Sequence, residues 1–421
     1  MALINRTRLL LLVRTATALK ALAVVLFFQH PRTWEDAIMA ANLIQTGELY
    51  LTHLGNAYHS GQFPVYPLAV SAMYAVFGLY TLPVVLLNLL LNALNAWVFV
   101  VLCEAFLDRM DTAGAFQAAR KPIVWACALA FLAHPLINQY VMNNVHPFAL
   151  DMLAFYAPVI LVLRYFDRGA RPVDLVLIGI ATGFVLLTRT VLIVNLLPFV
   201  VLSLRESDWG SILKRAAVVL TIGLLVGVPW LVRNYQQDAV LGYTSTTGEI
   251  LWKGALPGSE GSNFLSDGRS VRGVLSAAED QHLQTMSVAE QNRFFTGKYL
   301  GMVQREPGRV AGMVLFKLRN FFWFRPLIGN DYGPEMRRFI PAYRVGYGTL
   351  LVLALASLPL FGMRTILVWS LLLGLGLFQS LFYVETRYRV VIEPLLIFLA
   401  ATSVASLAQR FRRTTKSALQ N

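Results

Sequence analysis

The feature that most constrains this chain is a series of long apolar runs, because about 20 predominantly apolar residues are enough for one helix to cross a bilayer. Only 14% of the 421 residues are charged, whereas charged residues make up about a quarter of an ordinary soluble domain. We therefore expect an all-α polytopic membrane protein and exclude both a soluble enzyme and a disordered chain. About ten transmembrane helices are predicted, at residues 9–28, 82–106, 122–140, 148–166, 173–188, 191–204, 216–232, 346–361, 365–384 and 390–407.

The net charge of +13 does not indicate a nucleic-acid partner, since the basic residues lie at the ends of apolar runs, where they report on membrane topology. The first run follows Arg6 and Arg8 and has no convincing small-residue cleavage site. We interpret it as a retained helix and not as a signal peptide. Cys103 and Cys127 fall inside predicted helices, which favours small apolar residues over a disulfide or a metal site.

One further apolar stretch, residues 65–79, decides the predicted topology. It is short, opens at Pro64 and closes at Gly78, which is typical of a helix that lies along the membrane surface. If it does not cross, sixteen basic residues of the termini and short loops share one face and only four share the other. The positive-inside rule then places both termini in the cytoplasm. If it did cross, this bias would disappear.

This topology divides the chain into three regions. Residues 1–232 form an N-terminal membrane core that includes an outer loop at 30–81. Residues 233–344 form an outward-facing loop with amphipathic helices, and residues 345–421 form the C-terminal membrane helices and a basic cytoplasmic tail.

The most informative polar residues are an acidic pair, Glu35 and Asp36, just past the first predicted span. They stand at the start of an amphipathic stretch that ends near Gly47. One interpretation is structural, since acidic side chains stabilise the positive N-terminal end of a helix. The motifs that follow the pair favour a catalytic interpretation.

These motifs occur in a characteristic order. Pro64-Val65-Tyr66-Pro67 opens the surface stretch, Pro229-Trp230-Leu231-Val232-Arg233-Asn234 closes the seventh run, and Arg387-Tyr388-Arg389 precedes the last run. Taken together with the early acid, they resemble the GT-C superfamily of membrane glycosyltransferases. The chain looks most similar to the bacterial branch of protein mannosyltransferases, aminoarabinose transferases and Rgt-type lipopolysaccharide sugar transferases. The resemblance covers most of the chain. It departs from the family pattern where Val65 interrupts a proline pair and where Met39 and Ala40 replace an aromatic residue.

The resemblance implies a GT-C-like bundle in the bilayer of a bacterial inner membrane, with its active site on the periplasmic face. It further implies an inverting transfer of a sugar from a polyprenyl-phosphate donor to a glycan, glycolipid or protein acceptor. The first-loop acid is the general base in that family, and Asp36 is the matching position, with Glu35 as the fallback. A carboxylate fits this role because the attacking hydroxyl must lose its proton.

A second group of candidates lies around the fourth run. Asp151 stands near its outer end, where an ionisable side chain is costly and suggests a function. Asn144 and His146 precede it in a short outward loop, and Tyr66 begins the surface stretch. We expect these residues to bind substrate, although Asp151 could equally pair with an arginine for structural reasons.

The leaving group would be a polyprenyl phosphate, which needs cationic stabilisation when the glycosidic bond breaks. Arg387 and Arg389, paired around Tyr388, are the preferred phosphate ligands. Further cations at outward positions are Arg189, Arg233, Lys317 and Arg319. Each of them could instead extend its charged end to lipid headgroups, as terminal lysines and arginines commonly do.

Other functions stay open at this point. One alternative is a lipid-linked oligosaccharide ligase or polymerase, which would usually rely on a late outer loop and not on an early acid. A transporter or flippase would show ionisable residues near mid-membrane and an inverted repeat, and a non-catalytic scaffold is a third alternative. The sequence requires no cofactor. A divalent metal stays open, although none of the outward histidines has ligand spacing.

Overall fold

The computed structural model describes residues 6–28, 31–111, 117–206, 208–259, 261–324 and 338–420. Almost all of its regular structure is helical. The strands form two small sheets: β1 (Arg32–Thr33) pairs in parallel with β4 (Asn144–Val145), and β2 (Leu51–His53) pairs with β3 (Asn56–Tyr58) in a hairpin. The predicted all-α polytopic membrane fold is confirmed.

All ten predicted runs fall on helices. Within the described residues, six helices are long and apolar enough to cross a membrane, or seven if a pair bent by 43° counts as one span. One of the six, residues 340–381, contains two of the predicted runs. The two runs that remain are the 17-residue α8 and a shorter segment formed by η1 and α9. The membrane helices are α1 (Arg6–Phe27), α4 (Thr81–Met110), α5 (Arg120–Ala133), α6 (Pro135–Asn143), α7 (Phe148–Asp167), α8 (Pro172–Thr188), η1 (Thr190–Leu196), α9 (Leu197–Glu206), α10 (Trp209–Asp238), α16 (Ile340–Leu355), α17 (Ser357–Phe361), η3 (Gly362–Thr365), α18 (Ile366–Leu381), η4 (Thr386–Val391) and α19 (Glu393–Gln420).

Prolines shape two of these helices. The bend between α5 and α6 occurs at His134, which has an extended backbone because the following Pro135 disfavours the helical conformation. Inside α7, Pro158 has no N–H to donate to the carbonyl of Ala154. The side-chain amide of Asn195 donates to that carbonyl at 3.0 Å, so a polar group that would otherwise be unsatisfied in the membrane has a partner.

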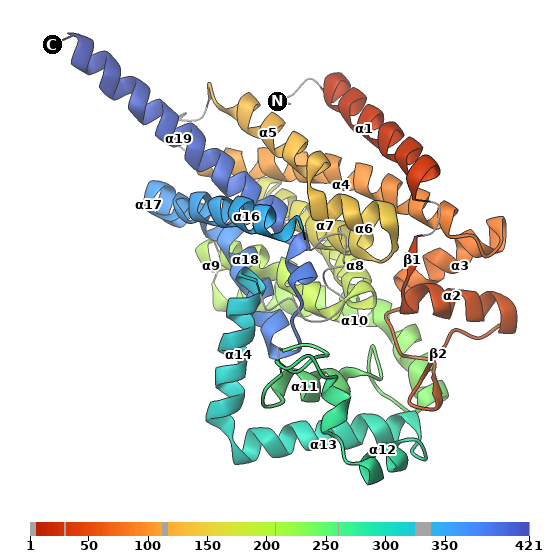
Figure 1. The fold of residues 1–421 in the computed structure, drawn as a ribbon. Coiled ribbons are helices and arrows are strands. Elements are labelled where there is room, and N and C mark those ends of the chain that lie inside the picture. Colours follow the sequence, from red (N-terminus) through yellow and green to blue (C-terminus); the bar gives the residue numbers. More distant parts are fainter. Residues whose placement is uncertain are drawn as a thin grey trace.

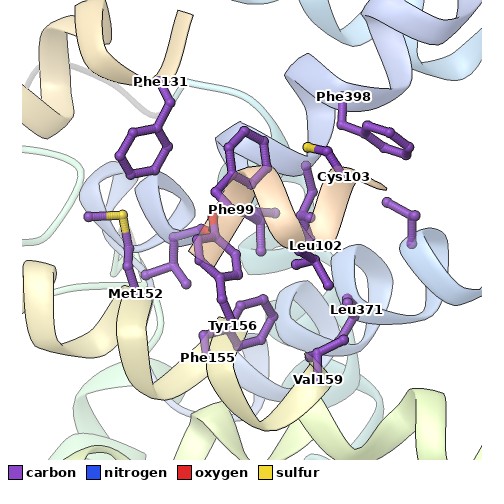
Figure 2. Close-up of a cluster of buried hydrophobic side chains, with 14 of the residues drawn as sticks. Phe99, Leu102, Cys103, Phe131, Met152, Phe155, Tyr156, Val159, Leu371 and Phe398 are labelled. Carbon is purple, nitrogen blue, oxygen red and sulfur yellow. The ribbon is translucent and has the colours of Figure 1, made fainter. Parts of the chain in front are cut away.

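The largest apolar cluster joins α4, α5, α7 and α19 (Figure 2). Phe99 stacks on Phe131 with ring centroids 5.5 Å apart, and Phe106 packs against Phe398. The hydroxyl of Tyr156, which is fully buried in this cluster, donates to the carbonyl of Val391 at 2.5 Å. This contact ties α7 to the turn that precedes α19.

The short helices α2 (Glu35–Thr46) and α3 (Val65–Phe77) pack against each other beside the membrane helices (Figure 1). Each ends at a glycine with positive φ, Gly47 at 81° and Gly78 at 79°, a backbone conformation that favours glycine. With 13 residues, α3 is shorter than a membrane span, and its placement along the membrane surface stays a prediction.

The chain between α10 and α16 forms a separate layer, which we call the outer segment after its predicted side of the membrane. It contains α11 (Thr247–Ala255), η2 (Val271–Val274), α12 (Ala277–Leu283), α13 (Val288–Arg305) and α14 (Pro307–Phe322). It has its own apolar cluster, in which Trp252 packs on Phe295 with ring centroids 4.9 Å apart. Both termini lie at one end of the molecule, and α11 to α13 lie at the other (Figure 1).

Candidate functional site

A cavity of about 310 Å³ lies between the ends of the membrane helices and the outer segment. Its wall is built from the first turns of α2 and α3, the turn before α7, the junction of α8 with η1, the helix α11, and the chain from the end of α18 into η4. The structure brings a large part of the predicted site together here. The predicted residues that line the cavity are Glu35, Asp36, Tyr66, His146, Arg189, Arg387 and Tyr388.

Asp36 lies in the first turn of α2, and its side chain is buried. Burial and the nearby charges of Glu35 and Asp151 raise the pKa of this carboxyl to about 7, while the charge of Arg189 opposes that shift. A general base is most effective when its pKa lies near the working pH. The environment of Asp36 therefore suits a group that accepts a proton near neutral pH.

Arg189 is held in the cavity wall by Asp151. The Arg189 guanidinium lies 3.1 Å from a carboxylate oxygen of Asp151, which is fully buried in the first turn of α7. Arg189 follows the last residue of α8, where a positive charge is favourable, and it also lies 5.2 Å from the centroid of the Tyr388 ring. Asp151 does not line the cavity, so the structure places it behind Arg189.

Arg387 lies in η4 and packs between aromatic rings. Its guanidinium is 4.6 Å from the ring centroid of Trp34 and 5.5 Å from that of Tyr388, and it pairs with Glu385. The Nε atom of Arg387 makes no hydrogen bond within the described residues. Arg387 thus keeps a donor for a ligand even though its charge is already paired.

His146 contacts the edge of the Trp34 ring, with centroids 5.4 Å apart. Burial lowers the pKa of His146 well below its usual value, and the charges of Arg387 and Arg189 lower it further. The imidazole is therefore neutral at physiological pH. Its Nδ1 atom has no hydrogen-bond partner in the described part of the chain. Asn144 lies outside the cavity lining and accepts a hydrogen bond from Trp34 Nε1 at 3.2 Å.

Arg389, predicted to bind the phosphate together with Arg387, does not line the cavity. Arg389 is fully buried on the other side of η4, where its Nε donates to Glu393 at 2.8 Å and its guanidinium lies 3.8 Å from the Tyr347 ring centroid. The reason is helical geometry. η4 is a 3₁₀ helix with three residues per turn, so residues two positions apart point in different directions.

The other predicted cations also lie outside the cavity lining. Arg233 donates to the carbonyls of His59 at 2.8 Å and Leu49 at 3.0 Å, beside a neighbouring groove of about 500 Å³. Lys317 is buried and donates to the carbonyl of Phe382 at 2.6 Å, near the end of α18. Arg319 is exposed on α14. Arg233 and Lys317 thus donate their hydrogen bonds to backbone carbonyls. The residue type alone does not reveal these partners.

Three acidic or basic residues of the cavity were not predicted from the sequence: His53, Glu249 and Lys253. Glu249 and Lys253 lie four residues apart on α11 and form an ion pair at 2.7 Å. His53 Nε2 lies 2.9 Å from the other Glu249 oxygen. The spacing of Glu249 and Lys253 is a recognisable signal for a helix pair, but nothing in it shows that α11 covers a cavity.

Gly254 allows α11 to approach the end of α18. A Cβ atom at this position would lie 1.9 Å from the carbonyl oxygen of Phe382. Gly254→Ala is therefore expected to force α11 away from the cavity and to lower the apparent melting temperature in detergent, since such overpacking costs about 1–3 kcal/mol. The matched control is Gly297→Ala on α13, where an added Cβ meets no atom within 4 Å. Equal melting temperatures for the two variants would contradict this packing.

No three His, Cys, Asp or Glu side chains gather closely enough to hold a metal ion in the part of the chain that the structure describes. In the cavity, the Glu249 carboxylate is already paired with Lys253 and with His53.

The fold and the site define an all-helical polytopic membrane protein with a charged cavity at one end of its helices. No family model and no curated protein matches the sequence. Among solved structures, two of ArnT from Cupriavidus metallidurans are similar to this chain. One, bound to undecaprenyl phosphate, has a TM-score of 0.40 at 15% identity over 95% of this chain and 77% of that one. The apo structure has a TM-score of 0.38 at 14% identity over 96% and 78%.

Proposed function

We propose that this protein is an integral-membrane glycosyltransferase that moves a sugar from a polyprenyl-phosphate donor to a glycan, lipid or protein acceptor. One observation carries the proposal: the Asp36 carboxyl shares a cavity of about 310 Å³ with the guanidinium groups of Arg387 and Arg189. Such a transfer needs a general base for the attacking hydroxyl and a cationic site for the leaving phosphate. This cavity contains candidates for both.

In the proposed reaction, an acceptor hydroxyl attacks the anomeric carbon of the donor sugar. Its proton passes to Asp36, a new carbon–oxygen bond forms, and the bond from the anomeric carbon to the phosphate oxygen breaks with its electron pair staying on the phosphate. A single displacement of this kind inverts the anomeric configuration. Glu35, also at the cavity wall, is the alternative base.

Arg387 and Arg189 are the proposed phosphate ligands. Arg189 follows the end of α8 and Arg387 lies in the turn before α19, so a lipid phosphate would reach both at the membrane surface while its prenyl chain stays in the bilayer. Their carboxylate partners, Glu385 and Asp151, orient the two guanidinium groups, and the five N–H donors of an arginine leave others for a phosphate. We place this site on the periplasmic face because the charge pattern puts both termini in the cytoplasm.

Arg387→Ala is expected to weaken binding of undecaprenyl phosphate by about 10-fold or more, since a hydrogen bond to a charged group contributes about 1.5–3 kcal/mol. Binding of radiolabelled undecaprenyl phosphate to the purified protein measures this. Arg319→Ala, which removes an exposed arginine from α14, is the matched control and should bind normally. Unchanged binding by the Arg387 variant would remove Arg387 from the phosphate site.

The function itself is tested by mass spectrometry of surface glycolipids and glycoproteins from a strain that lacks this protein. We expect one class of glycan to lose a sugar unit while the corresponding polyprenyl-phosphate sugar accumulates. Purified protein in proteoliposomes should consume that lipid. If it instead moved the lipid across the bilayer without consuming it, the protein would be a flippase and the proposal would fail.

A further inference from the structure

The cavity has a second polar wall, contributed by the outer segment and the β2–β3 hairpin, to which the proposed reaction assigns no role. Its charged members are Glu249 and Lys253 on α11, and His53 on β2 completes it. Hydroxyl groups of Thr244, Thr246 and Thr247, which lead into α11, line the cavity beside them. These side chains face the cavity from a different part of the chain than Asp36 and Arg387.

Glu249 is almost fully buried, with 4% of its surface exposed, and two partners that favour its charged form contact it, Lys253 at 2.7 Å and His53 at 2.9 Å. Burial alone would raise the pKa of Glu249, but the hydrogen bond from His53 and the charge of Lys253 lower it to about 2. A buried carboxylate costs a large desolvation free energy. Its presence at a cavity wall, held charged by two partners from different elements, indicates a site built for a ligand with hydrogen-bond donors.

The ion pair of Glu249 with Lys253 also has unused hydrogen-bonding capacity. Oε2 of Glu249 accepts from His53 at 2.9 Å, whereas Oε1 forms the ion pair with Lys253 and has no hydrogen-bond partner within the described residues. The ammonium group of Lys253 has three N–H donors, and its ion pair with Glu249 can occupy only part of them. An acceptor and a donor thus stand side by side, 2.7 Å apart.

We propose that Glu249 and Lys253 form a saccharide subsite that binds two adjacent hydroxyl groups of a sugar ring. One hydroxyl would donate to Glu249 and its neighbour would accept from Lys253. A carboxylate and an ammonium group of opposite charge make the wall neutral overall, which suits an uncharged polyhydroxyl ring. This inference rests on the proposed function, because the sugar belongs either to the lipid-linked donor or to the acceptor.

The test compares a ligand that carries the sugar with one that lacks it. The first is the lipid extract of a strain without this protein, in which the unused donor accumulates, and the second is undecaprenyl phosphate. Glu249→Gln and Lys253→Met should each raise the KM for the extract by about tenfold and leave undecaprenyl phosphate binding unchanged. Arg387→Ala should weaken both. Glu306→Gln, an exposed carboxylate paired with Arg309 outside the cavity, is the matched control.

The two sources of the sugar give different results. If the subsite holds the donor sugar, hydrolysis of the donor without acceptor is also slowed in the Glu249 and Lys253 variants. If it holds the acceptor, that hydrolysis is normal and only the KM for acceptor rises. Wild-type KM values for both substrates in both variants would overturn the subsite while leaving the transferase proposal intact. An extract that even the wild-type protein does not consume would overturn the transferase proposal itself.

Discussion

Asp36→Asn is expected to lower sugar transfer by about 10²–10⁴-fold, because general acid–base catalysis contributes rate factors of that size. The asparagine side chain has nearly the same shape but cannot take the proton from the attacking hydroxyl. Consumption of the lipid-linked donor by purified protein measures the effect. The level and melting temperature of the variant should match those of the wild type, since the raised pKa shows that the surroundings of Asp36 disfavour its charge.

Two comparisons make this test specific. Glu48→Gln changes an exposed carboxylate just beyond the end of α2 and should leave transfer unchanged. Glu35→Gln alters the neighbouring acid of the cavity and should cost much less than Asp36→Asn. Full activity of the Asp36 variant together with an inactive Glu35 variant would transfer the role of base to Glu35.

The raised pKa of Asp36 predicts that sugar transfer depends on pH. A base acts in its deprotonated form, and the pKa of Asp36 is raised to about 7. Transfer by the wild-type protein should therefore increase as the pH rises through about 7 and level off above it. The low-pH limb of the kcat/KM profile measures this, and it should vanish from the residual activity of Asp36→Asn. A profile that is flat between pH 5 and 8 would contradict the raised pKa.

The largest expected effect on stability comes from Glu393→Gln. The Glu393 carboxylate accepts from Arg389 at 2.8 Å and from the hydroxyl of Tyr343 at 2.6 Å, and it pairs with His134 at 2.8 Å. Removing its charge leaves the buried guanidinium of Arg389 without a counter-ion. Breaking a buried ion pair in this way costs about 3–5 kcal/mol.

The loss of stability in Glu393→Gln is measured by thermal unfolding in detergent, with intrinsic fluorescence as the signal. Asp167→Asn is the matched control because it removes the carboxylate of an exposed pair with Arg109, and such surface pairs contribute about 0–1 kcal/mol. The double variant Glu393→Gln with Arg389→Met should recover part of the stability, since it removes the unpaired charge as well. If the double variant were no more stable than Glu393→Gln, the ion pair would not be the source of the effect.

The position of Arg387 depends on this buried network. Arg389, two residues later, is fixed by Glu393 and by the carbonyl of Trp323, to which its Nη1 donates at 2.8 Å. These contacts orient the 3₁₀ turn so that Arg387 faces the cavity. The sequence motif Arg387-Tyr388-Arg389 thus combines a candidate ligand-binding arginine with a structural one.

Apolar runs were sufficient to predict the helices and the membrane-protein class, because in lipid each span must satisfy its own backbone hydrogen bonds, and this leaves a long local signal in the sequence. Asp36 could be proposed from its place after the first span only together with the motifs that follow it along the chain. The sequence alone did not show that Arg389 and Lys317 turn away from the cavity. It also did not show that Glu249, more than 200 residues from Asp36, forms the opposite wall of the same cavity.

Those features depend on contacts between residues far apart in the chain. Whether a charged side chain binds a ligand or satisfies a carbonyl is decided by its neighbours in space, and no local period or spacing records them. The sequence by itself therefore determined which segments are helices and which acid is the leading candidate base. Only the tertiary structure decided which cations accompany that acid, because long-range packing places residues of α11 and η4 around the same cavity as the start of α2.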